Sequence, residues 1–291
     1  MMYSSVKKET GFVESRENFP IYYDLYCPVT TQTRSFPVIL FLHGFKGFKD
    51  WGAFPDACEY LSRHGFCVLA INFSRNGVGK NMLEFDQPDL FEEQTLSSDL
   101  NDVGDVIKHL KNGELRSDQV MINTDIIGLI GHSRGGHTAV AAAAEYPGIQ
   151  AVVTWSAVAN YNERWSDEMK RDWETKGYTD IVNSRTGQTL KQGKVVYDDA
   201  INNADRLMAI KRVKEIHIPI LFIAGKEDES VPPSDSKKLF RECPSEDKEI
   251  KLIQHTGHTF STAHPFEDED FPEPFDDLLE LTETWFIEHL R

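Results

Sequence analysis

Cysteine is scarce in this chain of 291 residues, and long apolar runs are missing from it. No run is long enough to cross a bilayer, and residues 1–10 contain no apolar segment of the kind that a secretory signal requires. None of the cysteines forms a C-x-x-C pair, and most lie in or beside apolar segments. We therefore expect a cytoplasmic protein with no membrane partner and with reduced, structural thiols at Cys27, Cys58, Cys67 and Cys243.

Basic residues are outnumbered by acidic residues. Lys and Arg total 31, whereas Asp and Glu total 47, so the formal charge is −16. This charge repels the phosphates of nucleic acids and of anionic membranes, and we expect no nucleic-acid partner. A dense acidic segment spans residues 267–277. We expect it to be a solvated surface; a sharper hypothesis places it near a substrate entrance, where it would disfavour anionic substrates.

Apolar residues make up 40% of the chain and fall into short continuous runs separated by helical patterns. Continuous runs are typical of strands buried on both faces, as in a parallel sheet. Their alternation with helices predicts an α/β fold with helices on both faces of the sheet. We expect strands at Val38–Leu42, Cys67–Ile71, Ile126–Ile130, Ala151–Trp155, Ile220–Ala224 and Glu249–Ile253. We expect helices at Asp50–His64, from Ser97 or Ser98 to Leu110, and at His137–Glu145, Ser234–Cys243 and Phe275–Leu290.

Two segments depart from this alternation. Residues Gly11–Thr30 alternate weakly, which predicts one or two antiparallel edge strands. Residues 161–215 are polar, with helical patterns at Asp167–Thr175 and Asp198–Lys211 and a turn-rich middle at Arg185–Gly187. A stretch of this length without an apolar run is more typical of a functional lid than of a sheet. We therefore divide the chain into a core of residues 1–160 and 216–291 and a cap of residues 161–215.

The stretch Ile126–Gly136 carries the strongest signal for chemistry. Its apolar run ends in Gly131-His132-Ser133-Arg134-Gly135, which fits G-x-S-x-G, and a helix rich in small residues follows at once. A serine at such a sharp turn between strand and helix sits in strained backbone, and the glycines leave room for the turn. The amino end of the helix directs free N–H groups and its positive dipole end at the serine. We predict that Ser133 is a nucleophile.

A serine hydroxyl needs a base to take its proton, and the base needs a carboxylate to orient it. In an open parallel sheet such groups belong in loops beyond the carboxyl ends of strands. Asp228 follows the strand Ile220–Ala224 within G-x-x-D-x-x-V-P, and His258 follows Gly257 after the strand Glu249–Ile253. The order Ser133, Asp228, His258 is the order typical of α/β-hydrolases. We predict that these three residues form a catalytic triad.

Neighbouring residues offer alternatives to this assignment. Glu227 and Glu229 are rivals for the acid, and His255 and His264 are rivals for the base. His255 and His258 also read as H-x-x-H, a spacing that binds metal when it lies on a helix beside a carboxylate ligand. Here the spacing falls on a strand and its loop, so we expect no metal.

An oxyanion hole needs two N–H donors that face the developing negative charge. We expect one from the backbone of Arg134, whose side chain is interpreted as a surface ion pair at most. We expect the other from the backbone of Phe45, in the loop after Val38–Leu42, where Gly44 permits close approach. Three aromatic residues are candidates for lining the substrate pocket: His132, Trp165 and Trp173. For the two tryptophans the alternative is that they fill the cap's own core.

In their order, these motifs resemble those of the α/β-hydrolase superfamily: His43-Gly44-Phe45, Gly131–Gly136, Asp228 with Val231-Pro232, and Gly257–Phe260. Within it the chain looks most like carboxylesterases of the cinnamoyl and feruloyl esterase type. It is also similar to dienelactone hydrolase-like proteins and to the catalytic domain of prolyl oligopeptidase-type peptidases. The resemblance implies an α/β-hydrolase fold, with a mostly parallel eight-stranded sheet and a cap inserted after the sixth strand. Residues 161–215 fit that insertion.

The resemblance implies a serine hydrolase that cleaves a small-molecule ester through an acyl-enzyme, without a cofactor. Dienelactone hydrolases use a cysteine nucleophile, so Ser133 argues against that activity. Prolyl oligopeptidases carry a large β-propeller before the hydrolase domain, and only one or two edge strands are expected here before the first buried strand. We therefore favour an esterase over a peptidase or amidase. A hydrolase-fold binding protein without turnover is the third hypothesis, and the oligomeric state stays open.

Overall fold

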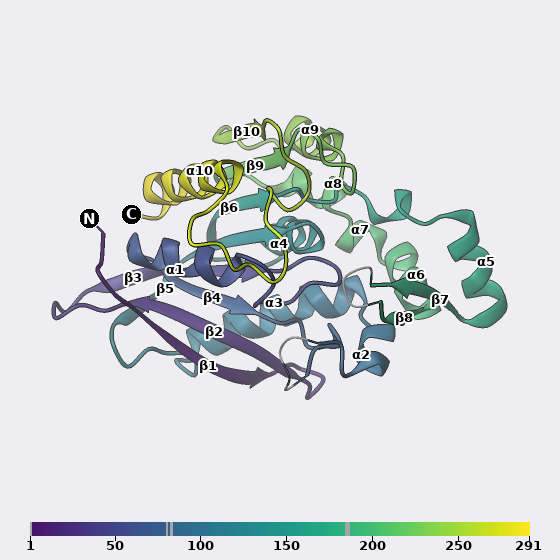
Figure 1. The fold of residues 1–291 in the computed structure, drawn as a ribbon, viewed down its shortest axis with the longest axis horizontal. Helices are drawn as coiled ribbons and strands as arrows, with labels where there is room; N and C mark the ends of the chain where they lie inside the picture. Colours follow the sequence, from purple (N-terminus) through teal and green to yellow (C-terminus); the bar gives the residue numbers. More distant parts are fainter. Residues whose placement is uncertain (1, 80, 82–83, 184–186) are drawn as a thin grey trace.

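A sheet of eight strands runs through the middle of the protein in the order β1-β2-β4-β3-β5-β6-β9-β10 (Figure 1). The computed structural model describes residues 2–79, 81, 84–183 and 187–291. The first two strands in this order are antiparallel to their neighbours, and the strands from β4 to β10 are parallel. The predicted, mostly parallel eight-stranded sheet is confirmed. Its strands are β1 (Val6–Glu14), β2 (Pro20–Pro28), β3 (Ser35–Leu42), β4 (Cys67–Ile71), β5 (Met121–His132), β6 (Ile149–Trp155), β9 (Ile220–Gly225) and β10 (Lys248–Ile253).

The strand β3 explains why continuous apolar runs predict a parallel sheet. Val38, Leu40 and Leu42 point into an apolar cluster on one face of the sheet. Ile39 and Phe41 point into a second cluster on the other face. Helices α3 and α4 supply the first cluster, and α1 and α10 supply the second, so both faces are covered (Figure 1). Burial on both faces leaves no polar position in the run.

Apart from α2, which the sequence does not predict, the helices of the core fall where they are predicted, with shifted ends. Helix α3 begins earlier than predicted because Thr95, rather than Ser97 or Ser98, is its N-cap: the Thr95 hydroxyl accepts a hydrogen bond from Ser98 N at 3.0 Å. Helix α4 begins at the residue after Ser133 instead of at His137. The helices are α1 (Phe54–Arg63), α2 (Pro88–Glu92), α3 (Leu96–Lys111), α4 (Arg134–Glu145), α9 (Pro233–Glu242) and α10 (Glu273–Leu290).

The segment between β6 and β9 lies at one end of the molecule, beyond the sheet (Figure 1). The predicted helix at Asp167–Thr175 is present as α5, but the helix predicted at Asp198–Lys211 is divided into shorter pieces. The segment also contains an antiparallel hairpin, which its polar sequence does not predict. Arg185 and Thr186 of the predicted turn lie outside the described residues. The elements are a 3-10 turn (Tyr161–Glu163), α5 (Asp167–Lys176), β7 (Tyr178–Val182), β8 (Thr189–Gly193), α6 (Lys194–Asn202), α7 (Ala204–Leu207), α8 (Ala209–Arg212) and a second 3-10 turn (Val213–Glu215).

The cysteines belong to the packed interior. All four are buried, and Cys27 on β2 faces Cys67 on β4 with their Sγ atoms 2.6 Å apart. Among the described residues, no helix is long and apolar enough to cross a membrane.

Candidate active site

Ser133 lies at the junction of β5 and α4 with φ 56° and ψ −113°, in the left-handed region that strains a residue with a side chain. Its amide donates a hydrogen bond to Trp155 O at 2.8 Å, which anchors the turn to the next strand of the sheet. The flanking glycines have no room for a side chain. A Cβ on Gly131 would lie 2.2 Å from Gly135 O, and a Cβ on Gly135 would lie 2.1 Å from Leu42 O. The elbow predicted from G-x-S-x-G is therefore a tight backbone contact between β5, α4 and β3.

The loops after β9 and β10 bring Asp228 and His258 together. Asp228 Oδ2 accepts a hydrogen bond from His258 Nδ1 at 2.8 Å, and Oδ1 accepts one from Val231 N at 2.8 Å. Burial alone would raise the pKa of Asp228, but the hydrogen bond and charge of His258 outweigh burial and lower it. Asp228 is therefore a carboxylate that holds a proton on Nδ1 of His258. The other ring nitrogen of His258, Nε2, is left with its lone pair.

The alternative candidates for the acid and the base do not form a pair like that of Asp228 and His258. Glu227 and Glu229 are exposed, and His255 is 91% exposed beside Glu227. His264 accepts a hydrogen bond from Gly52 N at its Nδ1, at 2.8 Å, and its ring stacks on Trp51. Among the described residues, no group of three His, Cys, Asp or Glu side chains is arranged to hold a metal ion.

His132 fixes the backbone of the candidate base. Its Nε2 donates to the carbonyl of His258 at 2.9 Å, and the two rings lie 4.7 Å apart. Burial, together with the charge of the nearby His258, lowers the pKa of His132 to about 3, so the ring is neutral. With Nε2 as the donor, the neutral ring keeps its lone pair on Nδ1.

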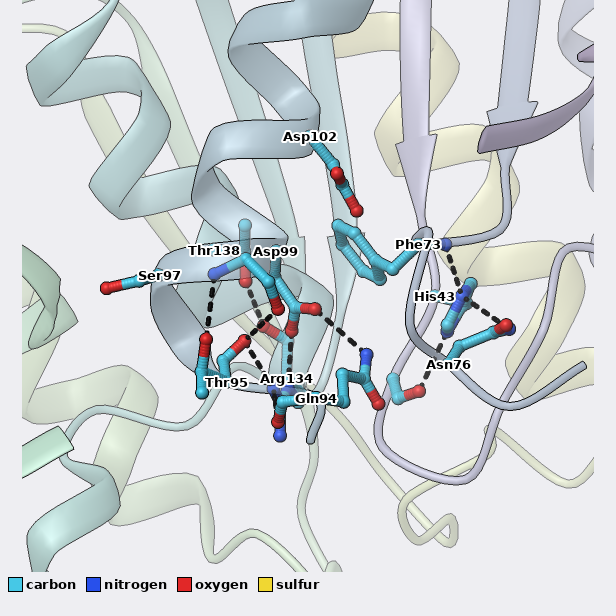
Figure 2. Close-up of polar contacts among 12 residues, drawn as sticks. His43, Phe73, Asn76, Gln94, Thr95, Ser97, Asp99, Asp102, Arg134 and Thr138 are labelled. Carbon is cyan, nitrogen blue, oxygen red and sulfur yellow. Dashed lines mark hydrogen bonds and ion pairs between the residues drawn. The ribbon is translucent and has the colours of Figure 1, made fainter. Parts of the chain in front are cut away.

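His43 orients the peptide that carries the second expected oxyanion donor (Figure 2). Phe73 N donates to His43 Nε2 at 3.3 Å, so Nε2 is the acceptor and the proton lies on Nδ1. That Nδ1 lies 2.9 Å from Gly44 O, to which it donates. Burial lowers the pKa of His43 to about 4, so the ring stays neutral. Gly44 O and Phe45 N–H belong to one planar trans peptide and point in opposite directions, so fixing the carbonyl also fixes the N–H.

Arg134 is buried rather than exposed, and the interpretation of its side chain as a surface ion pair is wrong. The guanidinium is 1% exposed, and its Nε donates to Asp99 Oδ2 at 2.6 Å (Figure 2). Its Nη2 donates to the carbonyls of Gln94 and Thr95 at 3.0 and 2.9 Å. Its long side chain reaches back from α4 to the first turn of α3, where Asp99 is fully buried. The Arg134 amide begins α4, where helix geometry leaves N–H groups without a partner in the helix.

A cavity of about 390 Å³ opens beside Ser133. His132 lines it, together with aromatic residues of the β3–α1 loop and residues of the loop after β10. Asn183, at the end of β7, lines it from the segment between β6 and β9. Residues that line this cavity include Phe45, Trp51, Phe54, Ser133, His258 and His264.

Trp165 and Trp173 lie elsewhere. Their rings are 5.2 Å apart at right angles, and Trp173 stacks on Tyr197 at 5.0 Å. The indole N–H of Trp173 donates to Gln192 O at 2.9 Å. Neither tryptophan is among the described residues that line the cavity. The structure thus places them in the core of the segment between β6 and β9, which is the alternative raised for them, because a short polar segment needs large side chains to pack at all.

The fold and this geometry define the class: the protein is a hydrolase of the α/β-hydrolase type. The prolyl oligopeptidase family matches residues 54–265, more than half of the chain. The chain belongs to the prolyl oligopeptidase family.

Named relatives and solved structures agree with this class. The chain is 23% identical over 208 residues to the "Putative esterase YitV" of Bacillus subtilis (strain 168), covering 71% of this chain and 74% of that protein. The structure of Est1E from Butyrivibrio proteoclasticus with ferulic acid bound is 20% identical with a TM-score of 0.68, covering 96% of this chain and 98% of that one. The esterase domain from Rhodothermus marinus is 17% identical with a TM-score of 0.64, covering 99% and 100% of the two chains.

Sequence reasoning missed the residues that support the site. The sequence identifies His43 only as part of a motif. Its position directly before a glycine at a strand end is nevertheless a signal that its ring could hold the backbone of the following loop. Asp99 was missed too. Its signal is a carboxylate on the apolar face of α3, between Leu96 and Val103, where a charge is tolerated only with a buried partner.

We expect the Gly135→Ala substitution to disrupt the elbow, because the new Cβ would meet the carbonyls of Leu42 and His43 at 2.1 and 2.6 Å. The free energy of unfolding should fall by about 3 kcal/mol or more, since backbone on both sides cannot yield. Gly113→Ala is the control: that Cβ would meet nothing within 4 Å, and only the positive φ of 73° is strained. It should cost about 1–2 kcal/mol. Equal losses in urea unfolding would contradict the close-contact argument.

We expect His43→Phe to lower kcat for a chromogenic ester by about tenfold to a hundredfold with little change in KM, because the Gly44 carbonyl loses the His43 hydrogen bond and keeps only the one from Gly47 N at 3.0 Å. His137→Phe is a matched control. His137 is equally buried and pairs through Nδ1 with a backbone carbonyl, Val158 O, at 3.0 Å, but it does not touch Gly44. Both variants should unfold more easily, and only the first should lose kcat. A similar fall in kcat in both variants would show that His43 acts through stability alone.

Proposed function

We propose that this protein hydrolyses carboxylic esters through an acyl-enzyme, with Ser133 as nucleophile, His258 as general base and Asp228 as the orienting acid. One observation carries the proposal: Ser133 and His258 line the same cavity of about 390 Å³, and His258 Nδ1 is held by Asp228 at 2.8 Å. That pairing leaves Nε2 of His258 as the proton acceptor. No cofactor takes part in the proposed reaction.

In the acylation step, Nε2 of His258 takes the Ser133 proton as Oγ attacks the ester carbonyl. The resulting oxyanion accepts hydrogen bonds from the backbone N–H groups of Phe45 and Arg134. The imidazolium then gives its proton to the leaving alkoxide, and the alcohol departs. Asp228 holds the required tautomer throughout and stabilises the positive charge of the ring.

In the deacylation step, His258 removes a proton from a water molecule, which attacks the acyl carbonyl. The same two N–H groups hold the second oxyanion. His258 returns its proton to Ser133 Oγ as the acyl bond breaks and the carboxylic acid leaves. The pairing of His43 with Gly44 supports these steps, because it fixes the Phe45 amide before the substrate binds.

The size and lining of the cavity favour short acyl or aryl esters. Phe45, Trp51 and Phe54 give it apolar aromatic walls, and a volume of about 390 Å³ is at the small end of ligand sites. Ferulic acid in the similar structure of Est1E supports esters of the cinnamoyl type as one candidate. In this proposal residues 161–215 are a cap that contributes Asn183 to the wall, and residues 1–160 and 216–291 are the catalytic core.

A peptidase or amidase that uses the same residues is the second candidate, and the family match favours it. Hydrolysis of an amide requires protonation of a poorer leaving group, for which His258 is placed as the acid. A panel containing an aminoacyl 4-nitroanilide and a 4-nitrophenyl ester separates the two candidates. We expect turnover of the ester to dominate.

We expect Ser133→Ala to lower kcat/KM for 4-nitrophenyl acetate or butyrate by about 10⁴-fold or more, because the nucleophile is lost while the fold remains. Labelling by a fluorophosphonate probe should disappear in the same variant. Ser166→Ala is the control: this exposed serine caps α5 through a bond to Met169 N at 3.1 Å, far along the chain from the elbow. It should keep full turnover and labelling. Turnover that survives in Ser133→Ala, or wild-type protein that is not labelled, would overturn the proposal.

A further inference from the structure

The candidate catalytic cavity has a charge opposite to that of the protein. The chain carries a formal charge of −16, yet no Asp or Glu lines the cavity among the described residues. Among the lining residues that the structure describes, Lys46, in the loop between β3 and α1, is the one with a permanent charge. A lone ammonium in the wall of a largely apolar cavity attracts an anion, because few other groups compete for it and little water screens it.

The ammonium of Lys46 has N–H donors that make no hydrogen bond to the described residues. Its Nζ donates one hydrogen bond, to Val182 O at the end of β7, at 3.2 Å. A lysine ammonium carries three donors, and Lys46 has no other partner and no ion pair among the described residues. The residue is half-buried, and burial lowers the pKa of Lys46, since water no longer stabilises the charge fully. An anionic partner would restore that stabilisation.

The backbone at Lys46 is in a costly conformation. A turn closes over residues 44–47 through a bond from Gly47 N to Gly44 O at 3.0 Å, and within it Lys46 has φ 56°. Glycine adopts this conformation without cost, whereas a residue with a side chain pays about 1–2 kcal/mol. The strained residue directly follows Phe45, whose amide is the expected oxyanion donor. Strain of this kind is typical of functional sites.

The helical part of the acidic segment lies at a different cavity from the one beside Ser133. Of its residues, Glu273 and Asp277 line a different cavity, between α10 and β10, together with Glu280 and Glu288. The acidic side chains of α10 therefore belong to another surface of the protein. The hypothesis that this segment guards the substrate entrance against anions is not supported by the positions of its helical residues.

We propose that Lys46 binds an anionic group of the substrate, so that the preferred ester carries a carboxylate a few atoms from its scissile carbonyl. This inference rests on the proposed ester hydrolysis. Lys46 is then a specificity-determining residue: its remaining N–H donors reach across the cavity to the carboxylate while Val182 O holds the ammonium in place. Asn183, next to Val182 in the chain, also lines the cavity.

The test compares esters that differ in one negative charge. For a carboxylate on the acyl side, mono-4-nitrophenyl glutarate is compared with 4-nitrophenyl valerate. For a carboxylate on the alcohol side, 4-acetoxybenzoate is compared with 4-acetoxybenzamide. The ratio of kcat/KM, charged over neutral, is measured for wild type and for Lys46→Met, so that the intrinsic reactivity of each ester cancels. We expect Lys46→Met to lower this ratio by about tenfold to a hundredfold in one of the two pairs, which is the effect of losing one charged hydrogen bond.

Two further variants make the result specific. Lys46→Arg keeps the charge and should keep most of the ratio. Lys191→Met removes a charge from an exposed position on β8 of the same hairpin and should leave the ratio unchanged. Turnover of neutral esters with an unchanged ratio in Lys46→Met overturns the role of Lys46 and leaves the proposed function intact. Absence of turnover of every ester, with no labelling of Ser133, overturns the proposed function and this inference with it.

Discussion

The buried ion pair between Arg134 and Asp99 joins the parts of the protein that surround the candidate site. Arg134 begins the elbow helix and Asp99 lies in the first turn of α3, so the pair ties these two helices together on one face of the sheet. The guanidinium also lies 5.8 Å from the Phe45 ring and 5.7 Å from the Tyr161 ring. It therefore contacts the expected oxyanion turn on one side and the start of the segment between β6 and β9 on the other.

Such a pair is tolerated in the interior because Nε and Nη2 of Arg134 have partners, while the buried Nη1 has no hydrogen-bond partner among the described residues. Burial raises the pKa of the Asp99 carboxyl, and the guanidinium opposes that rise by charge and by a hydrogen bond. Gln94 donates to the same carboxylate at 2.9 Å. Removing either charge would leave the other buried without compensation, which costs far more than the intact pair contributes. The position of the elbow is thus set by electrostatics as well as by the close glycine contacts.

The sequence predicts much of the fold because the sheet is parallel and buried. Runs such as Val38–Leu42 leave little choice of conformation, and residues at the carboxyl ends of such strands meet at one edge of the sheet. That rule brings Ser133, Asp228 and His258 into one region before any coordinate is known. Positions that depend on long-range partners could not be predicted. The side chain of Arg134 is exposed or buried according to whether a carboxylate lies opposite it, and Asp99 lies 35 residues away in the chain.

The segment between β6 and β9 was the least predictable part for a related reason. Its helices are short, and its hairpin is held by pairing of β7 with β8 rather than by an apolar pattern. Trp165 and Trp173 could equally line a pocket or fill a small core, and only their contacts with Tyr197 decide. Asn183 and Val182 carried no signal in the sequence, because their importance comes from the loop that they face.

The cavity takes its walls from parts of the chain that are far apart: residues 44–54, 132–133, 183 and 258–264. This arrangement has a consequence for synthesis. During synthesis, Ser133 and the loop after β3 leave the ribosome long before His258 does. Domains fold as units, so the sheet is completed only after β10 has been made. In the proposed mechanism the serine has no proton acceptor until then. The protein would thus emerge from the ribosome inert and acquire reactivity only in the last stage of its own folding.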